Sequence, residues 1–246
     1  QFNKFGRNLR ADESLDLAPG SARSAKLTPA ARRQLLLSVP GVSSVEEIID
    51  VRGSVSAISK DPFTLTIVTL DKLRFTTPID PQYFGIATEA FANYEAEKLV
   101  LVSGTGVYGR NGRLENIKDV REVILLDEMD VPTQLEKLHS LEDGWFDGDG
   151  QKFDRSNLDW LSRAFDNYVS RTLLLPFTFP TVEGGVQFEW KRGEHDATLE
   201  VNLTDKTAYL HYYNSASDTD DDRDLDLNNA GAWEELNQYL MQYFTV

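Results

Sequence analysis

The stretch EEIIDVRGSVSAI, residues 46–58, decides the fold of the first half of this chain. Alternate positions in it are apolar or small, which is typical of a β-strand with one buried face. The residues in this phase are Ile49, Val51, Gly53, Val55 and Ala57. Because glycine has no side chain, Gly53 predicts a point where the strand bends sharply or lies close to another backbone. Residues 46–58 therefore indicate the first strand of a small, strongly curved sheet.

Two more strands are predicted on either side of a turn near Asp71. Apolar side chains alternate with polar ones in both, and the phase places Phe63, Leu73 and Phe75 in the core. The predicted outer row is Thr64, Thr66, Lys72, Arg74 and Thr76. This row is mildly basic but has no aromatic ring on which a nucleic-acid base would stack, which leaves Tyr83 and Tyr108 as candidates for that role.

The next two segments complete the predicted barrel. Residues 82–96 carry apolar side chains at spacings of three and four, which predicts an amphipathic helix. Residues 98–126 predict two long strands joined by a hairpin at Asn111-Gly112, with a bulge where two glycines follow each other closely in the first strand. Five strands with a helix between the third and fourth follow the OB plan. We expect an OB-like five-stranded β-barrel with a capping helix over residues 44–127; an SH3-like barrel is the alternative, because only strand pairing separates the two.

The second half of the chain predicts helices on both sides of a run of strands, after an acidic hinge at residues 127–132. The predicted helices lie at residues 134–141, from Ser156 onward and from Asn229 onward. The predicted strands are residues 186–192, 197–203 and 207–213, each with one apolar and one polar face. Residues 218–226 predict an acidic loop or, at its end, a short fourth strand. The fold class is therefore α+β, with a helix–antiparallel sheet–helix domain over residues 133–246.

The first 43 residues have a different composition from the rest. They carry a basic cluster at Lys4, Arg7 and Arg10, and then Thr28 and Pro29, which predict the start of a helix. The chain opens on a glutamine with neither a methionine nor an apolar leader. We expect residues 1–43 to be the end of a domain whose upstream part is missing.

The formal net charge of −15 is spread unevenly along the chain. Residues 1–43 carry +4, residues 44–132 carry −6 and residues 133–246 carry −13. A strongly acidic surface repels phosphate backbones and favours basic partners. The C-terminal half therefore predicts binding to a basic protein rather than to nucleic acid. No apolar run approaches the length of a membrane span, and we expect a soluble, cytoplasmic protein that does not bind a membrane.

The residue types that usually carry catalysis or bind metals form no recognisable set. The sequence has no cysteine, and none of its histidines has a second histidine three or four residues away. The three histidines are His139, His195 and His211. The segment from Asp147 begins like a calcium loop but has Lys152 where that loop needs glycine. We expect no enzyme activity, no cofactor and no metal; a hydrolase built on Glu189 and Glu200 is the alternative, because both carboxylates fall on one face of the predicted sheet.

Two motifs in the second half resemble a family of uncharacterised bacterial proteins. They are GWFDG, residues 144–148, and PTVEGGVQFEW, residues 180–190. The family pattern is a Gly-Trp-Asp-Gly loop followed by Pro-Thr-x-x-Gly-Gly-apolar-x-x-Glu-Trp, so Phe146 is an extra residue here. FNKFGRNL, residues 2–9, and the strand around VRGSV are similar to the middle of such proteins. Some members resemble toxin–antitoxin or defence companions, and the resemblance therefore implies an interaction role.

These observations lead to two functional predictions. The first is a non-enzymatic protein-interaction module, the antitoxin-like or adaptor member of a bacterial toxin–antitoxin or defence pair. Its predicted partner contacts are Trp145, Glu189, Trp190 and Glu200. The alternative is an OB-type nucleic-acid-binding protein. Its predicted contacts are Lys72, Arg74, Arg110 and Arg113.

Overall fold

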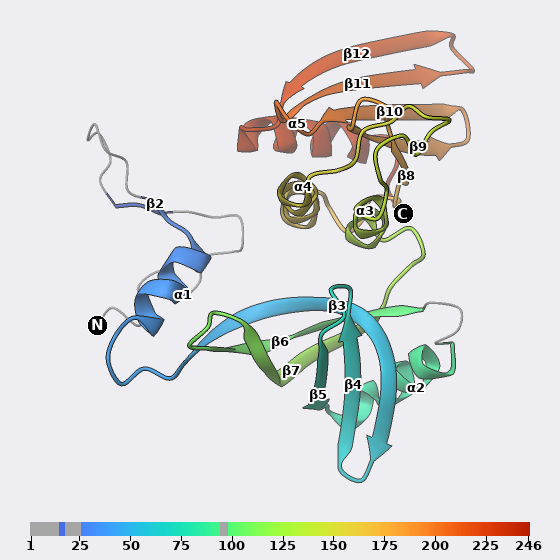
Figure 1. Cartoon of the computed structure of the whole chain (residues 1–246). Helices are drawn as coiled ribbons and strands as arrows, with labels where there is room; N and C mark the ends of the chain where they lie inside the picture. The colour runs from blue at the N-terminus through green and yellow to red at the C-terminus, as the bar shows by residue number, and fades with distance from the viewer. Residues whose placement is uncertain (1–14, 18–25, 94–97) are drawn as a thin grey trace. The chain divides into compact units, whose positions relative to one another are not determined.

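The computed structural model describes residues 15–17, 26–93 and 98–246 (Figure 1). The chain divides into two compact units, Gln1–Glu128 and Met129–Val246. Each unit contains a five-stranded antiparallel sheet together with helices, which confirms the α+β class. The basic cluster at Lys4, Arg7 and Arg10, the FNKFGRNL segment and residues 94–96 of the predicted amphipathic helix lie outside the described residues.

The first unit combines two short strands and a helix with the first sheet. Its elements are β1 (Leu15–Asp16), β2 (Lys26–Leu27), α1 (Pro29–Leu37), β3 (Ser44–Lys60), β4 (Phe63–Thr69), β5 (Arg74–Pro78), the 3-10 helix η2 (Pro81–Tyr83), α2 (Phe84–Ala92), β6 (Leu99–Gly109) and β7 (Leu114–Leu125). α1 begins as predicted, because the Thr28 hydroxyl accepts a hydrogen bond from the Ala31 backbone N–H at 3.1 Å.

The sheet of the first unit is curled into a half-barrel. Its strand order is β5-β4-β3-β6-β7, and the two edge strands, β5 and β7, come into contact with each other. α2 lies between β5 and β6 in the chain and packs Ala87 and Ala90 into the core inside the curl. The fully buried strand residues of this core are Val55, Leu65, Ile67, Val100, Val102 and Ile117.

Glycine and bulges produce the curl. A Cβ on Gly53 would lie 2.2 Å from the Val68 carbonyl oxygen, so only glycine fits this close approach of two backbones, as predicted. The register also shifts between Val55 and Ala57, and such a bulge reverses the faces to which the following side chains point. The prediction that Ala57 continues the buried phase is therefore wrong, since Ile58 packs against the core instead.

Two other side chains of the half-barrel differ from prediction. Leu73 is 44% exposed because it belongs to the turn before β5, where its backbone N–H donates to the Thr69 hydroxyl at 2.9 Å. Thr66 was expected in the outer row but is buried, and its hydroxyl lies 2.8 Å from that of Thr76 on the neighbouring strand. Thr66 therefore keeps the phase opposite to Leu65 and Ile67, and it is buried on the outer side of β4.

The second unit places helices on one face of a less curved sheet. Its elements are α3 (Val131–Leu138), α4 (Arg155–Tyr168), β8 (Phe177–Pro180), β9 (Val186–Arg192), β10 (His195–Asn202), β11 (Thr207–Asn214), β12 (Thr219–Asp226) and α5 (Ala230–Met241). The strand order is β12-β11-β10-β9-β8, and all neighbours are antiparallel. Figure 1 shows α3, α4 and α5 on the same side of this sheet. The core between helices and sheet includes Phe188, Trp190, Trp233 and Phe244.

Two segments of the second unit are more ordered than the sequence predicts. Residues 219–226 form the edge strand β12 rather than an acidic loop, because Leu225 is buried opposite Ala208 while alternate aspartates face solvent. The predicted hinge is shorter than expected, since Val131 and Pro132 begin α3 and are buried. Asp130 caps that helix by accepting a hydrogen bond from the Thr133 backbone N–H at 3.1 Å.

Candidate functional site

No helix covers the face of the second sheet that lies opposite its three helices (Figure 1). Side chains alternate along each strand, so the residues next to the buried ones point to this side. We call this surface the open face. It consists of Phe177, Phe179, Gln187, Glu189, Lys191, Asp196, Thr198, Glu200, Asn202, Thr207, Tyr209, His211, Tyr213, Asp220, Asp222, Asp224 and Asp226.

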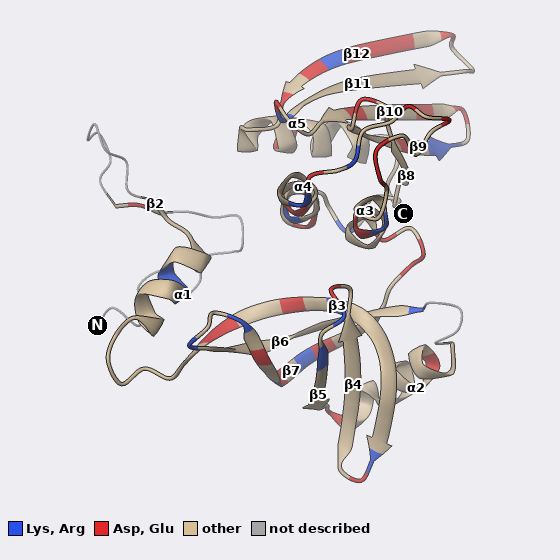
Figure 2. Cartoon of the chain, viewed as in Figure 1, with Lys and Arg blue, Asp and Glu red and all other residues tan. Residues whose placement is uncertain are grey.

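The open face is strongly acidic. Seven of its residues are Asp or Glu, and Lys191 is its one lysine or arginine. The Lys191 ammonium lies 3.0 Å from an Asp196 carboxylate oxygen, so even this positive charge is paired within the face. Arg223, the cation of β12, lies on the helix side of the strand and contacts Asp221 and Glu235 there. Figure 2 shows acidic residues along most of β12.

Three side chains fix the middle of the open face. His211 Nδ1 lies 2.7 Å from an Asp222 carboxylate oxygen. This hydrogen bond, and a second one from Tyr209, lower the pKa of Asp222, while the bond to Asp222 raises the pKa of Tyr209. Asp222 therefore stays charged at neutral pH and is held in one position.

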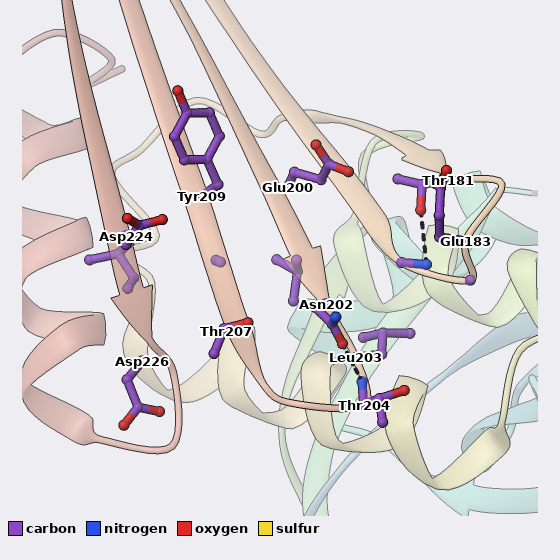
Figure 3. A pocket seen from close by; sticks show the side chains of 15 residues that line it. Thr181, Glu183, Glu200, Asn202, Leu203, Thr204, Thr207, Tyr209, Asp224 and Asp226 are labelled. Atoms are coloured by element: carbon purple, nitrogen blue, oxygen red, sulfur yellow. Dashed lines mark hydrogen bonds between the residues drawn. The ribbon is translucent and has the colours of Figure 1, made fainter.

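A hollow of about 820 Å³ lies at one end of the open face, where β10, β11 and β12 meet the loop between β8 and β9 (Figure 3). Four carboxylates line it, and no lysine, arginine or histidine does. They are Glu183, Glu200, Asp224 and Asp226. Hydrogen bonds fix its rim, since the Thr181 hydroxyl accepts from the Gly185 N–H at 2.9 Å and the Asn202 side chain accepts from the Thr204 N–H at 2.9 Å. Such a lining favours an ammonium or guanidinium group.

The edge opposite β12 is apolar. Phe177 and Phe179 on β8 are 54% and 43% exposed, and their rings stack with centroids 6.5 Å apart. Leu175, which precedes them with the same alternation, is also exposed. The open face therefore changes from apolar at β8 to acidic at β12. Such a surface is chemically complementary to one that is apolar at one end and basic at the other.

The two motifs that define the family resemblance lie side by side. The Gln151 backbone N–H, just after GWFDGDG, donates to the Val182 carbonyl within PTVEGG at 3.1 Å. Trp145 is half-buried, and its indole N–H donates to the Gln151 carbonyl at 3.2 Å. A Cβ on Gly150 would lie 2.6 Å from that indole nitrogen. These contacts hold the two loops together, and Phe146 is 53% exposed at the surface of the first loop.

The predicted partner contacts fall into different places. Glu189 and Glu200 lie on the open face, although only Glu200 lines the hollow. Trp190 is 2% exposed and donates its indole N–H to the Leu174 carbonyl at 2.9 Å, so it belongs to the core rather than to a surface. Glu189 pairs across the sheet with Thr198 instead of Glu200. The structure thus does not place the two glutamates of the hydrolase alternative in a shared hollow.

Among the described residues, no group of three or more acidic or histidine side chains is arranged to hold a metal ion.

The four predicted nucleic-acid contacts are all exposed but do not form one surface. Lys72 and Arg74 lie where β4 turns into β5, near Gly53 of β3, whereas Arg110 and Arg113 lie at the hairpin that pairs with Ser44. Nine residues of strand, up to roughly 30 Å of chain, separate these points on β3.

The two tyrosines proposed as stacking platforms are occupied. The Arg33 guanidinium lies 4.0 Å from the centre of the Tyr108 ring, and burial raises the pKa of that tyrosine. The Tyr83 side chain packs against the core of the half-barrel, and its hydroxyl donates to the Arg121 carbonyl. The half-barrel therefore presents no free aromatic platform at these positions.

Sequence reasoning missed two parts of the open face. It treated the aspartates of β12 as a loop, although their alternation with Arg223 and Leu225 is a period-two signal. It also passed over Phe177 and Phe179, whose spacing around Thr178 carries the same signal.

Within the described residues, no helix has the length and apolar character to cross a membrane. No protein-family model, no curated protein and no solved structure matches this chain.

Proposed function

We propose that this chain is a cytoplasmic, non-enzymatic interaction module whose open face binds a basic protein. The observation that carries the proposal is the charge of that face, where seven carboxylates surround a single lysine that is already paired. Complementary charge of this density speeds association with a basic partner and disfavours acidic ones. The family resemblance adds the expectation that the chain is the antitoxin-like or adaptor member of a bacterial toxin–antitoxin or defence pair.

The apolar edge refines the chemistry of the partner. Phe177 and Phe179 supply stacked aromatic area, which is the type of residue that anchors many interfaces. A matching partner presents an apolar side chain toward β8 and lysines or arginines toward β10, β11 and β12. Charge alone then sets the rate of encounter, and the aromatic edge adds to the residence time.

The proposal is tested with a fluorescently labelled oligolysine peptide at low ionic strength. In the test variant, Glu200, Asp220 and Asp224 become lysine, since all three are exposed on the open face. A matched control converts three exposed acids elsewhere in the unit, Glu142, Asp149 and Glu234. The two variants have the same net charge, and they differ only in where the charge has changed.

We expect the open-face variant to bind the peptide at least roughly tenfold more weakly than the control variant, because each exposed charge pair contributes up to about 1 kcal/mol. Binding should also weaken steeply as salt is added. Equal affinities for the two variants would mean that the peptide senses net charge alone, and the open face would lose its proposed role.

A second candidate function is nucleic-acid binding by the half-barrel. We propose that this sheet is of the OB type, since β3 pairs with both β4 and β6, and α2 lies between the third and fourth strands. This pairing favours an OB-like over an SH3-like barrel, because it makes the first strand the central one. Arg74 and Arg110 are the residues to test, by filter binding of a short single-stranded oligonucleotide at low salt. Retained binding after both become alanine, or no binding by the natural chain, would remove this candidate.

A further inference from the structure

The strand β12 has a free edge that is long enough to accept another strand. It is the outermost strand of its sheet, and it pairs with β11 without a register shift over eight residues. It contains neither proline nor glycine. Because alternate residues of an edge strand direct N–H and C=O groups away from the sheet, β12 presents a row of donors and acceptors. The opposite edge, β8, has four residues and ends in Pro180, which makes it a poorer template.

Both sides of this edge have room for the side chains of an added strand. On the open side lie the exposed aspartates of β12, at positions 220, 222, 224 and 226. On the helix side a hollow of about 380 Å³ lies between β12 and α5. Asp221, Glu235 and Tyr239 line this hollow. Its one cation, Arg223, is already engaged, 2.9 Å from Asp221 and 3.0 Å from Glu235.

The charges of β12 decide which strand fits. Edge strands of neighbouring copies tend to pair with each other unless charged side chains prevent it. In such a pair the aspartates of two copies would face each other across about 4.8 Å, which is the spacing of adjacent strands. The edge therefore repels a second copy of this chain. A strand with lysine or arginine at alternate positions would instead place each cation beside an aspartate.

We propose that β12 binds an extended basic segment of the partner as a sixth strand of the sheet. This inference rests on the proposed function and specifies how the partner docks. Main-chain hydrogen bonds provide affinity in this mode of recognition, and alternate side chains provide specificity. Cations of the added strand lie along the open-face aspartates Asp220, Asp222 and Asp224.

The test uses an eight-residue peptide of alternating lysine and threonine with blocked ends, which matches the length of β12. Two control peptides have the same sequence and charge, one with N-methyl groups on its lysines and the other with N-methyl groups on its threonines. Each control loses the N–H donors along one edge only. Because one edge of the bound peptide faces β12, we expect one control to bind roughly tenfold or more weakly than the parent and the other to keep most of its affinity. Amide exchange of alternate β12 residues should also slow when the parent peptide binds.

Equal binding of all three peptides would overturn the inference, because attraction by charge alone does not depend on backbone N–H groups. A parent peptide that fails to bind while oligolysine still distinguishes the open-face variant from its control would also overturn strand addition, and the proposed function would stand. If oligolysine fails to distinguish those two variants, the proposed function itself is wrong. The two failures are therefore separate observations.

Discussion

The two units of this protein each build a five-stranded antiparallel sheet, yet the first sheet is curled into a half-barrel and the second is less curved. In the half-barrel, register shifts interrupt the pairing of β3 with β4 and of β6 with β7. The four pairings of the second sheet run without such a shift. Bulges increase local twist and bend a strand. In this protein the sheet with interrupted register buries a face within its own curl, and the sheet with continuous register packs that face against helices.

The units also treat charge differently. In the first unit, Arg33 lies 2.6 Å from Glu47 and Lys118 lies 2.7 Å from Glu46, so these charges are neutralised locally. In the second unit the open face keeps most of its carboxylates without a basic neighbour. The unpaired carboxylates of the open face can therefore attract a positively charged molecule, whereas the paired charges of the first unit attract it less.

The largest expected effect comes from removing the close approach that allows the curl. Gly53→Ala places a Cβ 2.2 Å from a backbone oxygen, and we expect it to lower the free energy of unfolding of the first unit by about 3 kcal/mol. Tryptophan fluorescence isolates the second unit, because all four tryptophans lie there. They are Trp145, Trp160, Trp190 and Trp233. Far-UV circular dichroism should show an earlier transition in denaturant while fluorescence does not; a matching shift in fluorescence would show that the units unfold together.

A smaller effect, about 1 kcal/mol at neutral pH, is expected for Asp221→Asn on the helix side of β12. Hydrogen bonds from Arg223 and then Tyr239 lower the pKa of Asp221, and its partial exposure limits what they contribute. Because the folded pKa lies below the unfolded one, this stabilisation is present above the ordinary pKa of aspartate and is lost as the pH falls through the folded value.

The difference in stability between the natural chain and Asp221→Asn should therefore shrink between about pH 6 and about pH 2, as measured by denaturant titrations followed by fluorescence. Asp220→Asn is the control, since its side chain faces the open side of the same strand. A difference that persists in acid would mean that packing rather than charge explains the effect.

Gly85→Ala should act in the opposite direction to Gly53→Ala, although both add one methyl group to the first unit. Gly85 is an exposed residue of α2, and a Cβ there meets nothing within 4 Å. We expect a gain of roughly 0.5–1 kcal/mol, because alanine favours a helix over glycine. Circular dichroism in denaturant measures it. A loss of stability would contradict the expectation that helix propensity decides the effect at this position.

The smallest effect is expected on the open face itself. Asp224→Thr replaces an exposed edge aspartate by a residue that favours strands and also removes repulsion from neighbouring acids. We expect a gain of a few tenths of a kcal/mol in the second unit, together with weaker binding of oligolysine. A clear loss of stability would indicate that Asp224 supports the sheet rather than a partner.

Much of this architecture was readable from the sequence, because it depends on local signals. The Thr28 cap, the hairpin at Asn111-Gly112 and the alternation in β9 and β10 each rest on a few neighbouring residues. The bulge after Val55 was not readable, since it depends on how β3 pairs with β4. For that reason Ile58 packs against the core in place of Ala57.

The candidate site was only partly predictable. Glu189 and Glu200 follow from strand alternation. Of β12 only a short strand at its end was predicted, because aspartates disfavour strands and Leu225 alone marks the buried phase. Tertiary pairing with β11 overrides that local preference. Trp190 was predicted to contact a partner because it belongs to a motif. It lies two residues after Phe188 on the same strand, however, and this spacing already indicated that both side chains are in the core.

The loop that carries Phe146 is a suitable place to attach a label to this protein. Its base is closed by hydrogen bonds from the Gly144 N–H to the Gly150 carbonyl and from the Gln151 N–H to the Val182 carbonyl, and Phe146 takes part in neither. Changes at the tip should therefore leave the loop intact. Because the sequence has no cysteine, Phe146→Cys creates a single thiol, to which a dye or spin label can be attached at one defined point of the second unit.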